Sequence, residues 1–135
     1  MLHHWIVLTL CAASTLCGCA SVTQVEAGRH DRFRNALVES CRSIKAGDFQ
    51  AARGHLRQAS SLARGNEQSA KIADLELVCQ GAEALHAGRP GEAAASWLAI
   101  QDIQLKNQLI ELAREEGINL MVLASNRHSD EGVNP

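Results

Sequence analysis

The cysteines are the side chains in this 135-residue sequence with the most evident chemistry. A cysteine thiol can be alkylated or acylated, can ligate a metal ion, or can join a second thiol in a disulfide. Three of the five cysteines, Cys11, Cys17 and Cys19, lie within the first 19 residues. Only Cys19 follows a small residue, Gly18, because leucine precedes both others. The close spacing of Cys17 and Cys19 also leaves open a pair of metal ligands.

An apolar run over residues 5–16 leads into these cysteines. It has about a dozen residues, which suits a signal-peptide core and is too short for a membrane span of roughly 20 residues. Its end, Leu16-Cys17-Gly18-Cys19, resembles the lipobox of bacterial lipoproteins: an aliphatic residue, two small residues and the cysteine that receives the lipid. The resemblance implies that signal peptidase II removes residues 1–18 and that Cys19 carries a diacylglyceryl thioether and an acylated amine. The alternative is an ordinary buried N-terminal helix.

The residues after Cys19 set the expected location. Ala20 and Ser21 take the place of the aspartate that favours inner-membrane retention in enteric-type bacteria, so the resemblance implies an outer-membrane anchor facing the periplasm. Several acyl chains make such an anchor stable.

Two cysteines remain in the mature chain beside Cys19, and an even pair in an oxidising compartment predicts a disulfide between Cys41 and Cys79. Two buried thiols that pack as small apolar residues are the alternative. A zinc site that includes His55 or His86 is a weaker one, because no paired-ligand spacing supports it.

The composition predicts one all-α domain without a nucleic-acid partner. The net charge of −2 gives no basic footprint for nucleic acid and no basic arm for anionic lipid headgroups, tyrosine is absent, and good helix formers dominate the mature chain. Arg29, Arg32 and Arg34 follow the expected tether closely. We expect a solvated helix face there, with contact to lipid headgroups or to an acidic patch of a partner as alternatives.

An internal repeat of about 41 residues is visible around two Ala-Gly pairs that end at Gly47 and Gly88. In each copy we expect a helix closed by the glycine, which adopts a left-handed conformation without strain, and then a second helix. Asp48 can cap the second helix of the first copy, and Pro90 suits the first turn of its counterpart. The repeat also aligns Leu56 with Trp97.

Apolar spacing predicts the helices of these copies. The first carries a stripe from Phe33 to Ile44, and the second runs over residues 49–62 with Gly65 closing it. Asn66 is the expected cap of a third helix that ends near Ala87. We expect the third helix to be buried on two sides, with one stripe at Ala73, Leu77, Gly81 and Ala84 and another at Ile72, Leu75, Cys79 and Ala82. A fourth helix is expected from Pro90, and a fifth over residues 102–124 with a break at 115–117.

The segment Ala46-Gly47-Asp48-Phe49, with Ala52, Leu56 and Ala59 after it, resembles the turn and second helix of a tetratricopeptide repeat. The resemblance covers residues 36–62 and 77–103. It implies two stacked antiparallel hairpins and a C-terminal capping helix, with Cys41 and Cys79 at near-equivalent heights on neighbouring helices. Trp97 is then either a plug between helices or a partner-binding residue.

No catalytic motif, phosphate loop or metal-ligand spacing stands out, so we expect no enzyme activity, cofactor or small-molecule substrate. The predicted layout is a signal peptide over 1–18, a helical-repeat domain over 19–124 and a disordered tail over 125–135. The predicted role is a lipid-anchored module that binds another envelope protein. A pilotin-like escort of a secretin is one alternative, and a small-ligand carrier or enzyme is the alternative from another class.

Overall fold

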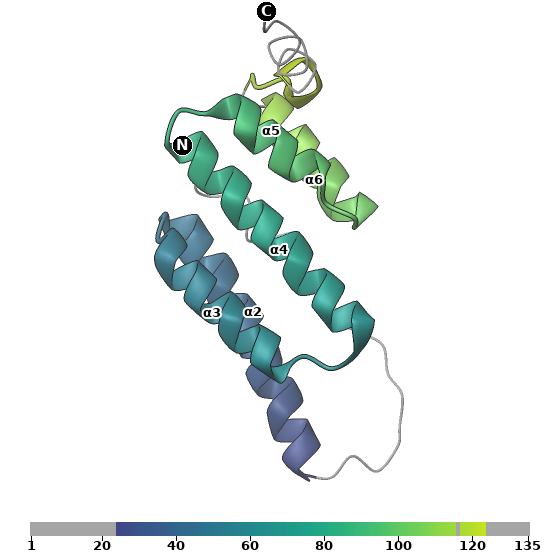
Figure 1. The fold of residues 1–135 in the computed structure, drawn as a ribbon. Helices are drawn as coiled ribbons and strands as arrows, with labels where there is room; N and C mark the ends of the chain where they lie inside the picture. The colour runs from purple at the N-terminus through teal and green to yellow at the C-terminus, as the bar shows by residue number, and fades with distance from the viewer. Residues whose placement is uncertain (1–23, 116, 124–135) are drawn as a thin grey trace, which may run out of the picture. The chain divides into compact units, whose positions relative to one another are not determined.

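The computed structural model describes residues 24–115 and 117–123, and helices are the regular elements of this part of the chain. They are α2 (Gln24–Ala46), α3 (Phe49–Leu62), α4 (Gly65–His86), α5 (Pro90–Leu98) and α6 (Ile103–Glu115), as Figure 1 shows. The predicted all-α class is confirmed. The predicted signal peptide and tail lie outside the described residues.

Contacts divide the chain into two compact units, Met1–Ile72 and Ala73–Pro135, with the division inside α4. The first unit contains the α2–α3 hairpin and the start of α4. The second contains the rest of α4 with α5, α6 and a further helical turn from Leu120.

The core of the first unit comes from the predicted stripes of α2 and α3. Its buried side chains are Phe33, Ala36, Ser40 and Ile44 from α2 and Ala52, Leu56 and Ala59 from α3. They recur at steps of three and four residues, so each set lies on one face of its helix. Helix α2 extends well before this stripe, to Gln24, and is therefore much longer than α3.

The turn between α2 and α3 is the one that the sequence predicts. Gly47 has a φ of 77°, its N–H donates to the Ile44 carbonyl (3.0 Å), and the Asp48 N–H donates to the Ser43 carbonyl (2.9 Å). This is the Schellman pattern that closes a helix on a left-handed glycine. The Asp48 carboxylate then accepts a hydrogen bond from the Ala51 N–H (2.9 Å) and caps α3.

The second copy repeats this turn. Gly88 has a φ of 72°, with bonds from its N–H to the Leu85 carbonyl and from the Arg89 N–H to the Ala84 carbonyl. Pro90 is the first residue of α5, as predicted, and Arg89 at the cap makes no side-chain capping bond. Gly117, which is also left-handed, closes α6 in the same way, at the predicted break.

The connection between α3 and α4 differs from the prediction. Helix α3 ends at Leu62 because Ala63 is extended, and Gly65, with a φ of 78°, begins α4 instead of closing α3. Asn66 therefore lies inside the first turn and is not the cap. The Arg64 N–H donates to the Gln68 side-chain oxygen (2.6 Å). A side chain from within α4 therefore provides the acceptor for a backbone N–H that lies just before the helix begins.

Helix α4 is buried on two sides, as predicted, but one position of the predicted stripes is wrong. Ala73 is exposed and its neighbour Asp74 is buried. Asp74, Val78 and Gly81 form one buried stripe, and Leu75 and Cys79 lie on another face of the helix.

Candidate functional site

The predicted lipidation site lies outside the described residues. This holds for Cys19 and for the lipobox residues Leu16, Cys17 and Gly18. Among the residues that are described, no helix is long and apolar enough to cross a membrane.

The structure shows no disulfide bond between Cys41, which is half-buried on α2, and Cys79, which is buried on α4. The two cysteines belong to different units. The disulfide therefore stays a prediction.

Trp97 lies in the core of the second unit, with 4% of its surface exposed. Its indole N–H donates to the Val78 carbonyl of α4 (3.2 Å). The ring lies against Gly81, where a Cβ would come within 2.2 Å of the indole nitrogen. Of the two roles considered for Trp97, the structure favours the plug between helices: the missing side chain of Gly81 makes the space that the ring fills.

Asp74 is a structural residue that the apolar pattern did not reveal. Only 6% of its surface is exposed, and its two carboxylate oxygens accept hydrogen bonds from the backbone N–H groups of Gln101 (2.8 Å) and Asp102 (3.0 Å). Asp102 in turn accepts from Gln104 and Leu105 and caps α6. Asp74 thus fixes the connection between α5 and α6. The only signal in the sequence was an acidic residue between apolar ones.

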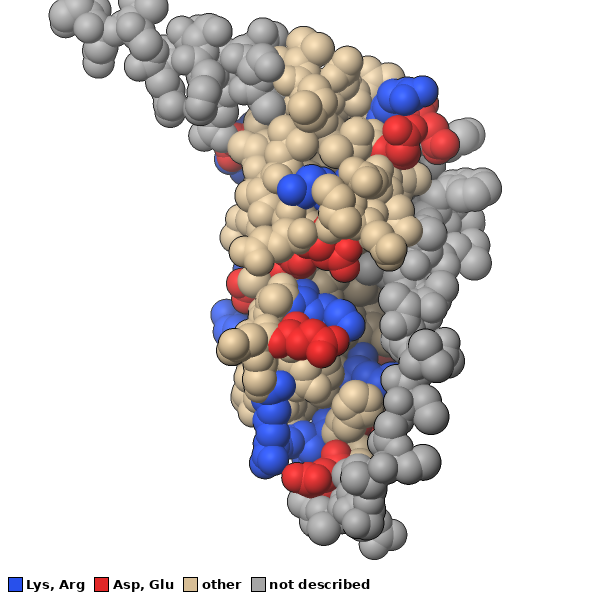
Figure 2. Space-filling model, turned by 90° about the vertical axis from the view of Figure 1, so that its right-hand side faces the viewer, with Lys and Arg blue, Asp and Glu red and all other residues tan. Residues whose placement is uncertain are grey.

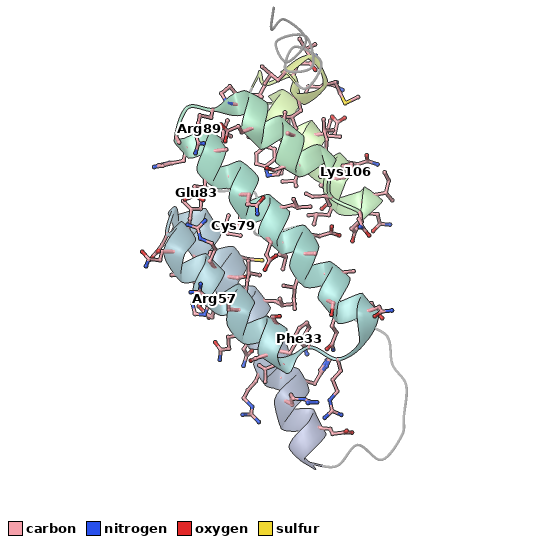
Figure 3. The ribbon with its side chains drawn as sticks, in the orientation of Figure 1. Phe33, Arg57, Cys79, Glu83, Arg89 and Lys106 are labelled. Carbon is pink, nitrogen blue, oxygen red and sulfur yellow. The ribbon has the colours of Figure 1, made fainter. Side chains whose placement is uncertain are left out.

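A cleft opens in the first unit because the two helices of its hairpin differ in length. Leu62 ends α3 near Phe33 of α2, so the first turns of α2 have no α3 residues opposite them. The α3–α4 connection and the start of α4 border this end instead. Figure 3 labels Phe33 close to the end of α3.

The cleft has a volume of about 470 Å³ and mixes charged and apolar side chains. Such a volume falls within the usual range of small-molecule pockets. The residues that line it are Glu26, Ala27, Arg29, His30, Asp31, Phe33, Leu62, Arg64 and Gln68. They come from α2, from the end of α3, from the α3–α4 connection (Arg64) and from the start of α4.

One nitrogen of a charged group in this cleft lacks a hydrogen-bond partner. The Nη2 atom of Arg29 is buried and makes no hydrogen bond among the residues that the structure describes. Arg64, by contrast, lies 3.3 Å from the Glu26 carboxylate in an exposed ion pair. Arg32 and Arg34 are exposed, as predicted for a solvated helix face, whereas Arg29 is half-buried, which corrects that prediction for this residue.

The net charge of −2 conceals an uneven distribution that the sequence reasoning missed. Residues 24–72 contain nine Lys or Arg against five Asp or Glu, and residues 73–123 contain three against eight. Figure 2 shows charged side chains on one face of the molecule, with Lys and Arg in blue and Asp and Glu in red. The first unit is therefore basic and the second acidic. Counting charge by segment would have found this.

The described residues include no cluster of His, Cys, Asp or Glu that could hold a metal ion. Comparisons of the chain with family models, with curated proteins and with solved structures find no match. The function of the chain must therefore be inferred from its own residues.

Proposed function

We propose that the chain is a bacterial lipoprotein anchored through Cys19 in the outer membrane, with its helices in the periplasm. The observation that carries this proposal is the motif Leu16-Cys17-Gly18-Cys19 at the end of a short apolar run. Two or three acyl chains on one residue give an anchor that does not need a membrane-spanning helix.

The helical part acts, in this proposal, by binding another envelope protein and not by catalysis. Two features support it: helical hairpins closed by the same glycine turn, and large apolar side chains at exposed helix positions in both units. Val38 on α2 is 44% exposed and Ile103 at the start of α6 is 61% exposed. Exposed apolar side chains of this size supply contact area to a second polypeptide.

The anchor is tested by replacing Cys19 with Ser and following incorporation of labelled fatty acid in cells. We expect Cys19→Ser to abolish labelling and to leave residues 1–18 attached, as judged by mass. Cys17→Ser is the matched control and should be labelled and cleaved normally. Continued labelling of Cys19→Ser would refute the proposed anchor.

The binding role is tested with Val38→Asp and Ile103→Asp in an envelope pull-down, with the exposed Ala70→Asp as control. We expect one envelope protein to be retained by the parent chain and by the control, and to be lost in at least one of the two apolar variants. Equal retention by all four chains would count against these surfaces. Turnover of a substrate by the purified chain would overturn the wider proposal that it is not an enzyme.

The disulfide between Cys41 and Cys79 belongs to the same proposal, because a periplasmic location is oxidising. Such a bond typically stabilises a protein by about 2–4 kcal/mol. Non-reducing mass spectrometry of alkylated, exported protein decides it: a mass lower by two hydrogen atoms with no alkylated thiol supports the bond, and two alkylated thiols refute it.

A further inference from the structure

We propose that the cleft of the first unit binds the phosphodiester group of an anionic lipid, with the Arg29 guanidinium as its main contact. The phosphate site itself depends only on the cleft and its charges. The choice of a lipid as the source of the phosphate rests on the proposed anchor at Cys19.

The hydrogen bonding of Arg29 favours an anionic ligand. A buried donor that lacks an acceptor destabilises the folded protein, and more so when the donor is charged. Arg29 Nη2 is such a donor, and it belongs to a residue that lines the open cleft of about 470 Å³. Solvent does not reach Nη2 where it lies, but Arg29 as a whole is half-buried, so a rotation of its guanidinium toward the cleft would bring this donor to a ligand oxygen that supplies the missing acceptor. Guanidinium groups bind phosphate oxygens well, because their fork of N–H donors matches two oxygens at once.

The acidic residues of the cleft favour a ligand with a single negative charge. Two acidic residues, Glu26 and Asp31, also line the cleft. Glu26 is engaged by Arg64, which leaves Asp31 to repel an anion near Arg29. A phosphodiester with a single negative charge is repelled less than a phosphate monoester, which carries about −1.5 to −2 at neutral pH. Phe33 and Leu62 add apolar surface that suits the first methylene groups of the acyl chains of a lipid.

The charge of the whole first unit also favours an anionic ligand. Four excess positive charges in residues 24–72 attract an anionic surface. Arg29 follows Cys19 by only ten residues, so the proposed anchor holds the cleft close to the lipid headgroups.

The experiment is calorimetric titration of the full chain carrying Cys19→Ser, which removes any bound lipid anchor. The ligands are monomeric short-chain phosphatidylglycerol, the zwitterionic short-chain phosphatidylcholine, and inorganic phosphate. We expect one phosphatidylglycerol to bind per chain, with much weaker binding of the other two.

Two charge-matched variants locate the site. Arg29→Gln should weaken phosphatidylglycerol binding by about tenfold, as expected for the loss of one hydrogen bond to a charged group. Arg57→Gln removes the same charge from an exposed position on α3, labelled in Figure 3 and outside the cleft, and should change binding less than twofold. Asp31→Asn should strengthen binding, a gain that misfolding cannot mimic. Circular dichroism of each variant checks its fold.

Several outcomes would overturn the proposal. Equal losses in Arg29→Gln and Arg57→Gln would show diffuse attraction without a site, and unchanged or weaker binding by Asp31→Asn would contradict the charge argument. No binding of any ligand would refute the site outright. Tighter binding of inorganic phosphate, lost in Arg29→Gln, would keep the phosphate site and refute the lipid source. Fatty-acid labelling at Cys19 tests the anchor separately, so failure of one proposal is distinguishable from failure of the other.

Discussion

The two units have the same turn and different interiors. At the turns the backbone hydrogen bonds are equivalent, with Gly47 and Gly88 in the same left-handed conformation. In the interior, the 41-residue offset pairs Ser40 with Gly81 and Leu56 with Trp97, and all four residues are buried. The second copy has the larger side chain at one position, Trp97 in place of Leu56, and the smaller residue at the other, Gly81 in place of Ser40. The two copies thus share the glycine turn that reverses the chain, whereas different side chains fill their cores.

The largest losses of stability are expected at Trp97 and Leu56, the buried side chains at equivalent positions of the two copies. Trp97→Ala should lower the free energy of unfolding by about 3–5 kcal/mol, because it removes a buried ring and its hydrogen bond to Val78. Leu56→Ala, at the equivalent buried position, should cost about 2–5 kcal/mol. Urea denaturation followed by circular dichroism measures both. A loss below 1 kcal/mol for Trp97→Ala would mean that the ring is not a structural plug.

The next effect compares two aspartates that cap helical connections. Asp74→Ala should cost roughly 1.5–3 kcal/mol, since it leaves the N–H groups of Gln101 and Asp102 without their charged acceptor. Asp48→Ala removes an exposed helix cap and should cost only about 1 kcal/mol. The same denaturation measurement applies. An equal cost for the two would remove the distinction between a buried and an exposed capping carboxylate.

The glycines of the two units should respond to alanine with opposite signs. Gly81→Ala should destabilise by about 1–3 kcal/mol, because the new Cβ collides with the indole ring of Trp97. Gly54, inside α3, has no neighbour within 4 Å of a built Cβ, so Gly54→Ala should stabilise by about 0.5–1 kcal/mol. Stabilisation by both substitutions would show that the contact between Gly81 and Trp97 is not tight.

A double-mutant cycle sharpens the same point. Combining Gly81→Ser with Trp97→Leu gives the second copy the pair that the first copy has, Ser40 and Leu56. The loss of unfolding free energy in the double variant should be smaller than the sum of the two single losses by about 0.5–3 kcal/mol, the usual coupling of residues in contact. A double-variant loss equal to the sum of the single losses would contradict the idea that residues 81 and 97 share one space in the core.

The turns and helices were predictable because their signals are local. A left-handed glycine, the Asp48 cap and Pro90 at a first turn act within a few residues, and α3 begins and ends where its apolar stripe does. Asp74 was not predictable, since its partners lie 27 and 28 residues away and only the fold brings them together. The cleft beside Arg29 was missed for a similar reason: it arises from the unequal lengths of α2 and α3, which a stripe beginning at Phe33 does not reveal.

The pairing of helices that are neighbours in sequence bears on how quickly the chain folds. Helix α2 packs on α3, and α5 on α6, so these contacts span short stretches of chain. Helical proteins rich in such local contacts fold in microseconds to milliseconds. Chain synthesis is far slower, at about 5–20 residues per second. The α2–α3 hairpin therefore has time to form as soon as its residues leave a ribosome or a translocation channel, before α5 and α6 have followed.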